Sequence, residues 1–523
     1  MKNEKFSRRK FINIGIGIGV SQALGNSVFA STPATTVHGA CYHDCPDTCS
    51  WTVTAVGETI TKFEANKSNP FTAGKLCSKM DNFPNDVTFH PDRILKPLKR
   101  IGPKGKGEFK TVTWNEAINE ISVKLKSIIS EKGGEAVLPY SFAGTEGLIQ
   151  KDLMSARFFE RIGATRLERN ICGDAAVAGV MVTNGDTTGV LPEDIVHSRY
   201  IILWGTNPVV SNQHLWPFIL KARQNGAKVV VIDSFQSQSA ALADQHIQPM
   251  PGTDVVLALA MINVILAEKI QDQNYIDQYT TGIEELKTYV NKFDPDSAAR
   301  ITGVDKTIIV NLATEYAKAN PSLIRVLIGL EKHASGANAY RAIAMLPAIT
   351  GAWKYLGGGL MHFTYELFGK ALNWERLTLA DKIAKSKTRS VNMIQIGRAL
   401  NHSTNPAIHA LFVYNSNPAV IAPDQNQVIK GLKREDLFTV VLEHFVTDTA
   451  RYADYVLPAT TQLEHWDLME SWGQNYINLN QPVISARGES KPNTEIFRTL
   501  AKAMDFKEPY FSESDLDIIK QTL

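Results

Sequence analysis

The stretch Tyr200-Ile-Ile-Leu-Trp-Gly-Thr-Asn207-Pro208-Val-Val decides the fold, because a related stretch recurs as Ala410-Leu-Phe-Val-Tyr-Asn-Ser-Asn417-Pro418-Ala-Val. The two copies align without a gap at an offset of 210 residues. At the same offset, Val230-Val-Ile-Asp233-Ser-Phe235 matches Val440-Val-Leu-Glu443-His-Phe445. Self-similarity at a fixed offset indicates a repeated structural unit. The sequence therefore predicts two related units.

Each copy reads as an apolar strand, an Asn-Pro turn, a helix and a second apolar strand that ends in an acidic residue. Continuous Val/Ile runs that alternate with helices predict parallel strands covered on both faces, so we expect two doubly wound, Rossmann-like α/β units. Ligands of such sheets bind at the carboxyl ends of the strands, with phosphates near helix N-termini and an acidic group on the ribose. Asn207 and Asn417 lie where the phosphate would bind, and Asp233 and Glu443 lie where the ribose would bind.

A purely structural interpretation of these residues stays open, since Asn-Pro pairs begin helices and acidic side chains cap them. The repetition favours the ligand interpretation, and the pair Asp254 and Glu464 continues the match. Two such binding sites predict either two nucleotide-like ligands or one ligand with two nucleotide groups. Neither copy carries the G-x-G-x-x-G motif, which counts against ordinary NAD or FAD binding.

Composition restricts the class of protein. The chain has 523 residues, of which 44% are hydrophobic and 21% charged, and this excludes collagen-like, disordered and disulfide-scaffold classes. The net charge is +2, but the first ten residues carry +4, so the remainder carries −2. Nucleic-acid affinity depends on neutralising phosphates. We therefore expect no nucleic-acid partner.

Residues 1–30 resemble an export signal. A basic segment precedes an apolar stretch from Phe11 to Leu24, and Val28-Phe29-Ala30 fits a cleavage pattern. Ser7-Arg8-Arg9-Lys10-Phe11-Ile12 resembles a twin-arginine signal, a route for proteins already folded around cofactors; an ordinary secretory leader is the alternative. We expect a periplasmic protein, exported by the twin-arginine machinery and cleaved near Ala30.

Four of the five cysteines lie close together, at Cys41, Cys45, Cys49 and Cys77. A tight triplet with one distant fourth member is typical of four thiolates around one metal centre, and it favours an iron–sulfur cluster. Zinc and disulfide bonds stay open as alternatives. The residues between Cys49 and Cys77 alternate like short strands, which predicts a small β-rich lobe.

Cys172 stands apart from the other four cysteines. A lone cysteine is more often a small buried apolar residue than a reactive one. Here, however, Gly173-Asp174 and a helix-compatible run follow it directly. A position just before a helix N-terminus favours a thiolate, so Cys172 is a candidate functional residue.

Together, the cysteine quartet, the leader, the lone cysteine and the two nucleotide-binding halves resemble the molybdopterin oxidoreductases of the dimethyl-sulfoxide-reductase family. The resemblance extends over residues 38–510. It implies a molybdenum or tungsten ion held by two pterin guanine dinucleotides, beside a [4Fe–4S] cluster. The local matches are Cys41 to Cys77 with Lys79, Asn170 to Gly179, Leu203 to Pro208, Pro251 to Asp254, and Thr447 to Pro458.

The resemblance also implies a role for each candidate residue. Cys172 would bind the molybdenum or tungsten, Lys79 would assist electron transfer between cluster and pterin, and His333 would act near the pterin, although such a histidine is more often structural. The cluster ligands would be Cys41, Cys45, Cys49 and Cys77. The residues near the pterin and its dinucleotides would be Gly205, Asn207, Asp233, Gly252, Asp254, Gly329, Gly336, Asn415, Asn417, Glu443, Thr447 and Asp448.

The expected organisation has four parts. After the signal, residues 38–95 form the [4Fe–4S] lobe, and residues 137–320 form the first α/β unit. Residues 96–136 together with 321–523 form the second. Family members usually continue into a β-barrel domain that closes over both pterins, so we expect this chain to lack that domain, which another chain would supply unless the protein is truncated.

The leading functional hypothesis is a periplasmic enzyme that performs two-electron oxygen-atom, sulfur or hydride-type chemistry on a small molecule. Its electrons would pass through the cluster to an electron-transfer subunit, a cytochrome or a quinone-linked membrane partner. The alternatives are a non-redox hydratase or transhydroxylase, a truncated electron-transfer or assembly subunit, and a secreted zinc-bound α/β protein. Formate dehydrogenases of the family have a histidine where this chain has Gly173, so formate is a less favoured substrate.

Overall fold

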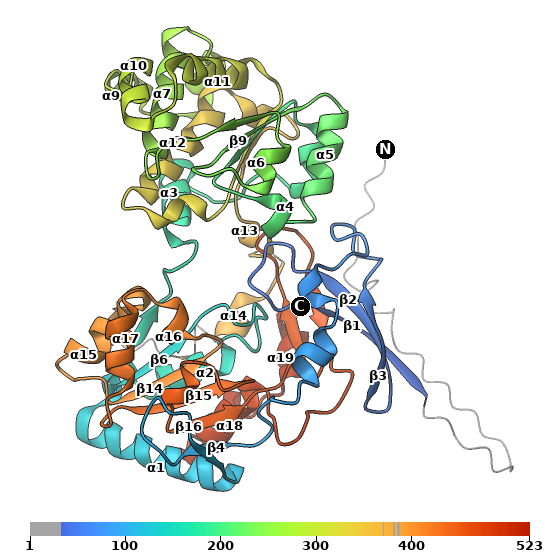
Figure 1. The fold of residues 1–523 in the computed structure, drawn as a ribbon, viewed down its shortest axis with the longest axis vertical. Coiled ribbons are helices and arrows are strands. Elements are labelled where there is room, and N and C mark those ends of the chain that lie inside the picture. Colours follow the sequence, from blue (N-terminus) through green and yellow to red (C-terminus); the bar gives the residue numbers. More distant parts are fainter. Residues whose placement is uncertain (1–32, 370, 380–381, 384–386) are drawn as a thin grey trace, which may run out of the picture.

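The computed structural model describes residues 33–369, 371–379, 382–383 and 387–523. The expected leader, residues 1–30, lies outside these described residues. No helix within them is both long and apolar enough to span a membrane. Figure 1 shows two α/β units, one above the other, and a small N-terminal lobe in blue beside the place where they meet.

The N-terminal lobe is built on a three-stranded antiparallel sheet of β1 (Ala34–Ala40), β2 (Ser50–Val56) and β3 (Thr59–Ala65). Alternate residues of β2, among them Trp51 and Val53, face inward and are buried. They pack in one cluster with Met80, Phe83 and apolar residues from the C-terminal part of the chain. The β-rich lobe is confirmed, and its core is shared with the rest of the protein.

The first α/β unit has a parallel five-stranded sheet in the order β10-β9-β8-β11-β12. Its central strand β8 (Tyr200–Trp204) sends Ile202 to one face and Ile201 to the other, and both are fully buried. Helices α7 (Asp254–Ala267) and α12 (Gly336–Ile349) cover the first face, and α5 (Trp216–Gln224) covers the second. The remaining strands are β9 (Lys228–Ile232), β10 (Gln245–Ile247), β11 (Ser322–Val326) and β12 (Gly359–Met361).

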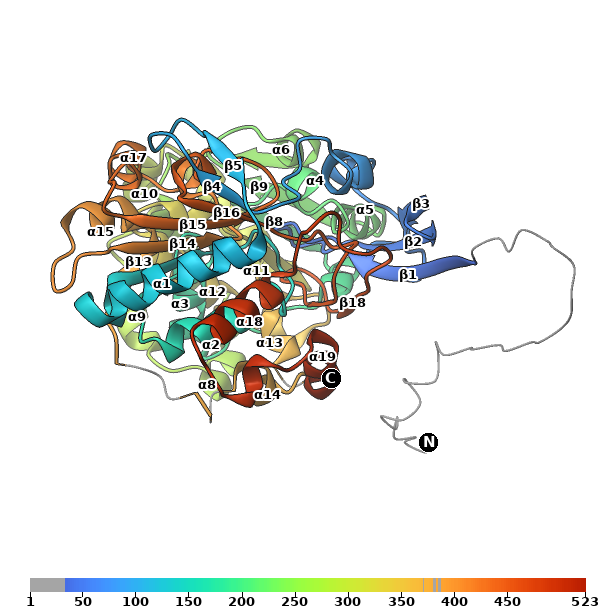
Figure 2. The ribbon, with the colours of Figure 1, turned by 90° about the horizontal axis from the view of Figure 1, so that it is seen from below.

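The second unit has a six-stranded sheet in the order β5-β4-β16-β15-β14-β6, whose last four strands are parallel. Helices α1, α2 and α18 cover one face, where α1 and α18 lie side by side (Figure 2), and α15 and α17 cover the other. The strands are β4 (Leu98–Arg100), β5 (Phe109–Thr111), β6 (Val137–Ser141), β14 (Ala410–Tyr414), β15 (Phe438–Glu443) and β16 (Tyr455–Pro458). The helices are α1 (Trp114–Lys132), α2 (Leu153–Arg161), α15 (Ile396–His402), α17 (Gln425–Leu432) and α18 (Asn493–Ala503).

Shorter elements complete the fold. The helices are α3 (Asp174–Asn184), α4 (Pro208–Ser211), α6 (Gln238–Leu242), α8 (Gln273–Tyr279), α9 (Ile283–Val290), α10 (Pro295–Thr302), α11 (Lys306–Lys318), α13 (Tyr365–Phe368), α14 (Trp374–Thr378), α16 (Pro418–Ile421) and α19 (Asp515–Thr522). The strands are β7 (Arg166–Glu168), β13 (Ser390–Asn392), β17 (Asp467–Met469) and β18 (Asn478–Asn480).

The internal repeat is visible in individual hydrogen bonds. The side-chain oxygen of Asn207 accepts from the backbone N–H and hydroxyl of Ser239, at 3.2 and 2.7 Å. The side-chain oxygen of Asn417 accepts in the same way from Thr449, at 3.1 and 2.6 Å. Both donors keep the offset of 210 residues. The predicted pair of doubly wound units is thus confirmed.

The domain boundaries differ from the expected ones. Strand β6 begins at residue 137, where the first unit was expected to begin, but it pairs with β14 in the second sheet. Strand β11 begins at residue 322, where the second unit was expected to resume, but it pairs with β8 in the first sheet. In each sheet, the first strand of the repeated stretch (β8 or β14) therefore pairs on one side with a strand from outside that stretch (β11 or β6). The choice of sheet depends on long-range pairing, which a short apolar run does not reveal.

Candidate functional site

The cysteine quartet lies at one end of the N-terminal lobe. Cys41 follows β1, Cys49 precedes β2, and the backbone N–H of Cys41 donates to the carbonyl of Cys49 at 2.8 Å. All five cysteines are free, so the structure does not support the disulfide alternative. Burial raises the pKa of the Cys41 thiol to about 12 and shifts that of Cys45 and Cys49 in the same direction. Only a cationic centre would make these groups thiolates at neutral pH.

The spacing of the sulfurs separates the two metal alternatives. Zn–S bonds of about 2.3 Å place the sulfurs of a tetrahedral zinc site about 4 Å from one another. Within the described part of the chain, the one group of three possible metal ligands that lie within 4.8 Å of one another is Asp47, Cys49 and His214. No three of the four sulfurs, all of which lie in the described residues, are within 4.8 Å of one another, so they are not gathered around one zinc position. Lys79 is exposed, and its charge lowers the pKa of Cys41, so it lies near the quartet as expected.

A cavity of about 350 Å³ opens at the carboxyl ends of β8, β9 and β11, where a doubly wound sheet binds its ligand. Gly205 follows β8 with a φ of +61°, and a Cβ added at Gly329 would lie 2.3 Å from the carbonyl oxygen of Gly205. Only two glycines allow the loops after β8 and β11 to approach so closely. The predicted residues that line this cavity are Gly205, Asn207, Asp233, Asp254, Gly329 and His333.

The acidic residues of this cavity differ in their surroundings. Asp233 is half-buried at the end of β9, and burial raises its pKa. Asp254 is buried and accepts a hydrogen bond of 2.9 Å from the indole N–H of Trp204. Gly252 stands behind His333, since a Cβ there would lie 3.3 Å from the imidazole Nδ1, and Gly336 begins α12. Six of the predicted residues therefore line one cavity, and Gly252 and Gly336 lie outside its lining.

The second expected site is assembled only in part. Asn415 has a φ of +51° and is the counterpart of Gly205 at the offset of 210 residues, and Gly144 packs against its backbone as Gly329 packs against Gly205. Asn415 lines a small cavity of about 30 Å³. The other predicted residues, Asn417, Glu443, Thr447 and Asp448, do not line that cavity. Asn417 instead caps Thr449, burial raises the pKa of Glu443 to about 7, and Asp448 is exposed.

Cys172 lines a separate cavity of about 490 Å³ to which all three parts of the protein contribute. Asp44 comes from the lobe, Glu146 and Glu470 come from the second unit, and Cys172 directly precedes Gly173, the N-cap of α3. Burial, Asp44 and Glu331 raise the pKa of Cys172 to about 12, so the helix N-terminus does not produce a free thiolate, contrary to expectation. Neither His333 nor Lys79 lines this cavity, so the structure does not bring the three predicted catalytic residues together in one cavity.

Comparison with known proteins decides the family. Residues 93–503 match the Molybdopterin oxidoreductase family, and residues 34–85 match the Molybdopterin oxidoreductase Fe4S4 domain. This chain belongs to the molybdopterin oxidoreductase family. It is a molybdopterin-dependent oxidoreductase with molybdenum–pterin and [4Fe–4S] cofactors.

Several relatives of this molybdopterin oxidoreductase are known. It is 42% identical over 483 residues to the probable oxidoreductase YoaE of Bacillus subtilis, covering 92% of this chain and 70% of that protein. It is 26% identical to the thiosulfate reductase molybdopterin-containing subunit PhsA of Salmonella typhimurium, covering 96% of this chain and 70% of the subunit. The solved acetylene hydratase from Pelobacter acetylenicus has the same fold, with a TM-score of 0.77 and 24% identity over 93% of this chain and 71% of that one.

The sequence did not indicate the residues that hold Cys172 in place. The carboxylate of Glu331 accepts a hydrogen bond of 3.1 Å from the backbone N–H of Ala176, in the first turn of α3. The ammonium of Lys332 donates to the carbonyl of Ile171 and, at 3.4 Å, to that of Cys172. Both side chains follow Gly329, which lines the first dinucleotide cavity. One short segment thus borders that cavity and fixes the loop that carries the predicted metal ligand.

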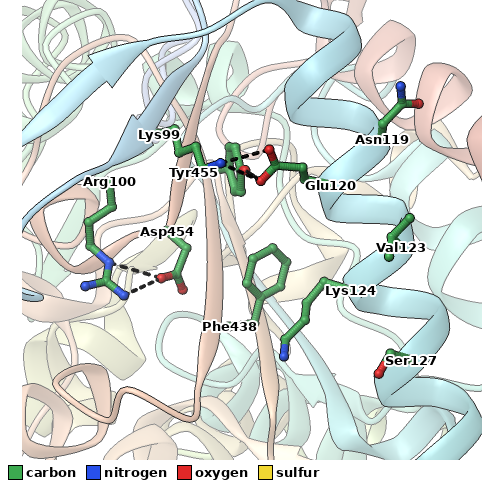
Figure 3. Close-up of a pocket in the computed structure, with 10 residues that line it drawn as sticks. All are labelled: Lys99, Arg100, Asn119, Glu120, Val123, Lys124, Ser127, Phe438, Asp454 and Tyr455. Carbon is green, nitrogen blue, oxygen red and sulfur yellow. Dashed lines mark hydrogen bonds and ion pairs between the residues drawn. The ribbon is translucent and has the colours of Figure 1, made fainter.

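A fourth cavity, of about 680 Å³, lies at the beginning of β15 and β16, against α1 (Figure 3). Four of its charged side chains form two ion pairs: Lys99 lies 2.7 Å from the carboxylate of Glu120, and Arg100 lies 2.8 Å from that of Asp454. These pairs join β4, α1 and the start of β16. We interpret this cavity as a junction between elements.

Proposed function

We propose that this protein is a periplasmic oxidoreductase whose molybdenum or tungsten, held by two pterin guanine dinucleotides, acts on a small molecule. The observation that carries the proposal is the position of Cys172, in a cavity bounded by the lobe and both α/β units and next to the first dinucleotide cavity. When bound, the metal supplies a two-electron change of oxidation level for oxygen-atom, sulfur or hydride-type transfer. The export signal in residues 1–30 supports the periplasmic location.

The roles of the residues follow from their places. Cys172 binds the metal, and Glu331 and Lys332 position it through the start of α3 and the carbonyls of residues 171 and 172. Asp233 accepts ribose hydroxyl groups, and Gly205 and Gly329 admit the pyrophosphate. Cys41, Cys45, Cys49 and Cys77 hold the cluster, and electrons pass between it and an electron-transfer subunit, a cytochrome or a quinone-linked membrane partner. Lys79, near the quartet, assists electron transfer between the cluster and the pterin.

The charges around Cys172 indicate the kind of substrate. Lys151 lies 3.0 Å from the carboxylate of Glu146, and Arg169 lies 3.5 Å from that of Asp152. These cations are therefore already paired. Burial raises the pKa of Glu470 to about 7, so this residue can donate a hydrogen bond in neutral solution. We infer that the cavity favours small uncharged compounds whose oxygen accepts a hydrogen bond, such as a sulfoxide or an N-oxide, over anions.

A substrate screen tests this proposal. The anaerobically purified holoenzyme is supplied with a reduced viologen and either an uncharged sulfoxide or N-oxide, or the anions nitrate and thiosulfate. We expect turnover of an uncharged compound at a kcat/KM at least tenfold above that of either anion, and its loss in Cys172→Ser. Faster turnover of the anions would contradict the charge argument. Hydration of an alkyne without any electron donor or acceptor would instead support the hydratase alternative.

A further inference from the structure

A short segment of the first α/β unit runs from the dinucleotide cavity to the cysteine quartet. Asn207 and Ser211, at the two ends of α4 (Pro208–Ser211), line the cavity. The carbonyl of Ser211 lies 4.0 Å from the sulfur of Cys45. Figure 1 shows α4 on the side of the first unit that faces the blue lobe. The segment after α4 therefore enters the surroundings of the cluster site.

Two buried side chains of this segment bind one carboxylate of the lobe. The amide of Asn212 donates to Asp47 at 2.5 Å, while its oxygen accepts from Arg325 at 3.1 Å. The imidazole Nδ1 of His214 lies 3.0 Å from the other carboxylate oxygen of Asp47. The same Nδ1 lies 3.6 Å from the sulfur of Cys49. His214, Asp47 and Cys49 are at most 6% exposed, so water does not compete for these contacts.

The partners of the imidazole determine which way its hydrogen bonds run. Nε2 lies 3.2 Å from the backbone carbonyl of Lys75, and a carbonyl can only accept. Nδ1 faces the Asp47 carboxylate and, once a cluster is bound, the thiolate of Cys49, and both are acceptors. A hydrogen on Nδ1 therefore lies between two acceptors, the Asp47 oxygen at 3.0 Å and the Cys49 sulfur at 3.6 Å, and it can be shared by both.

We propose that His214 donates a hydrogen bond to the Cys49 ligand and thereby raises the reduction potential of the cluster, with Asp47 and Asn212 as positioning residues. Reduction adds negative charge to a cluster and its thiolates, and hydrogen bonds to the sulfurs are among the features that set its potential. The inference rests on the proposed role of the quartet. It adds that the first α/β unit, which contains the proposed dinucleotide site, also raises the reduction potential of the cluster.

The test is a potentiometric titration of the anaerobically purified full chain, in which the reduced cluster is followed by EPR. His214→Leu removes the donor, and His214→Gln retains one. His409→Leu, in the second unit, is the matched control. We expect His214→Leu to lower the ratio of reduced to oxidised cluster about tenfold at a fixed potential, which is about 59 mV for one electron. His214→Gln should recover part of this shift, and His409→Leu should have no effect.

An unchanged potential in His214→Leu, with about four iron atoms retained, would overturn the inference and leave the proposed function standing. Should His214→Leu fail to hold iron, pulsed EPR on protein labelled with ¹⁵N-histidine replaces it. We then expect a weak ¹⁵N coupling to the reduced cluster in the unsubstituted protein that weakens in His214→Gln. The same coupling in both proteins would overturn the inference. Zinc without iron, bound by Asp47, Cys49 and His214, would overturn both proposals.

Discussion

A double-mutant cycle on the buried ion pair between Arg93 and Glu464 tests how the second unit holds the segment that follows the lobe. The guanidinium lies 2.6 Å from the carboxylate, and neither side chain is exposed to solvent. Arg93 also donates to the carbonyls of Thr88 and Ala459, both at 3.0 Å. Glu464 accepts from the backbone N–H of Thr461 at 2.6 Å. Glu464 is the counterpart of Asp254 in the internal repeat. Asp254 lines the first dinucleotide cavity, whereas Glu464 does not and forms this ion pair instead.

The expected magnitudes follow from the charge that each variant leaves behind. Arg93→Met leaves a buried carboxylate without its cation, and removing one partner of a buried pair costs about 3–5 kcal/mol of the free energy of unfolding. Glu464→Gln leaves a buried guanidinium whose remaining acceptors are carbonyl groups, so we expect a loss of the same size. The double variant has no buried charge left at this pair. Its loss should therefore fall below the sum of the two single losses by roughly 2 kcal/mol.

The assay is urea unfolding of the purified chain, followed by circular dichroism under identical cofactor loading. Lys96→Met is the control, because Lys96 and Glu489 lie 3.4 Å apart with side chains 58% and 41% exposed. Exposed pairs contribute at most about 1 kcal/mol. Losses that simply add in the double variant would refute the reasoning, since they would show that the two charges do not depend on each other.

Two further predictions concern the site, and a third concerns the buried carboxyl group of Asp467 in β17. Gly329→Ala places a Cβ 2.3 Å from the Gly205 carbonyl oxygen, so the two loops must separate. We expect at least a tenfold loss of bound pterin, measured by fluorescence of the oxidised extract. The iron content should not change. Lys332→Met removes the donor to the carbonyl of Cys172 and should speed loss of molybdenum or tungsten several-fold on dialysis, again without loss of iron. Burial raises the pKa of Asp467 from 3.8 to about 7, so the folded state binds its proton more tightly and loses this stabilisation as the pH rises through about 7. Asp467→Asn should therefore show a smaller fall in Tm between pH 5 and pH 8 than the unsubstituted protein, and an equal fall would contradict this assignment.

Much of the fold could be predicted because the repeat preserves both the sequence pattern and the bonds that depend on it. Asn207 and Asn417 each cap a residue 32 positions further on, so the same local geometry requires the same side chain in each copy. The sequence could not predict which of the two sheets β6 and β11 would each join. Both strands are fully buried parallel strands, and long-range pairing decides their partners.

The candidate site was predictable where the backbone itself is constrained. Gly205 and Gly329 are required by the close approach of two loops, and Asp233 stands at a strand end. His214 and Glu331 could not be found in this way. His214 meets Cys49 across 165 residues of sequence, and Glu331 meets Ala176 across 155. Neither contact is marked by a local motif, because both arise when separate parts of the fold come together.

The metal content of the anaerobically purified chain tests the central claim most directly. Iron, molybdenum, tungsten and zinc are measured per polypeptide by mass spectrometry, for the unsubstituted protein and for Cys172→Ser. We expect about four iron atoms and one molybdenum or tungsten in the unsubstituted protein. In Cys172→Ser, the iron should remain and the molybdenum or tungsten should fall. Zinc in place of iron, or molybdenum bound equally well by Cys172→Ser, would contradict the claim.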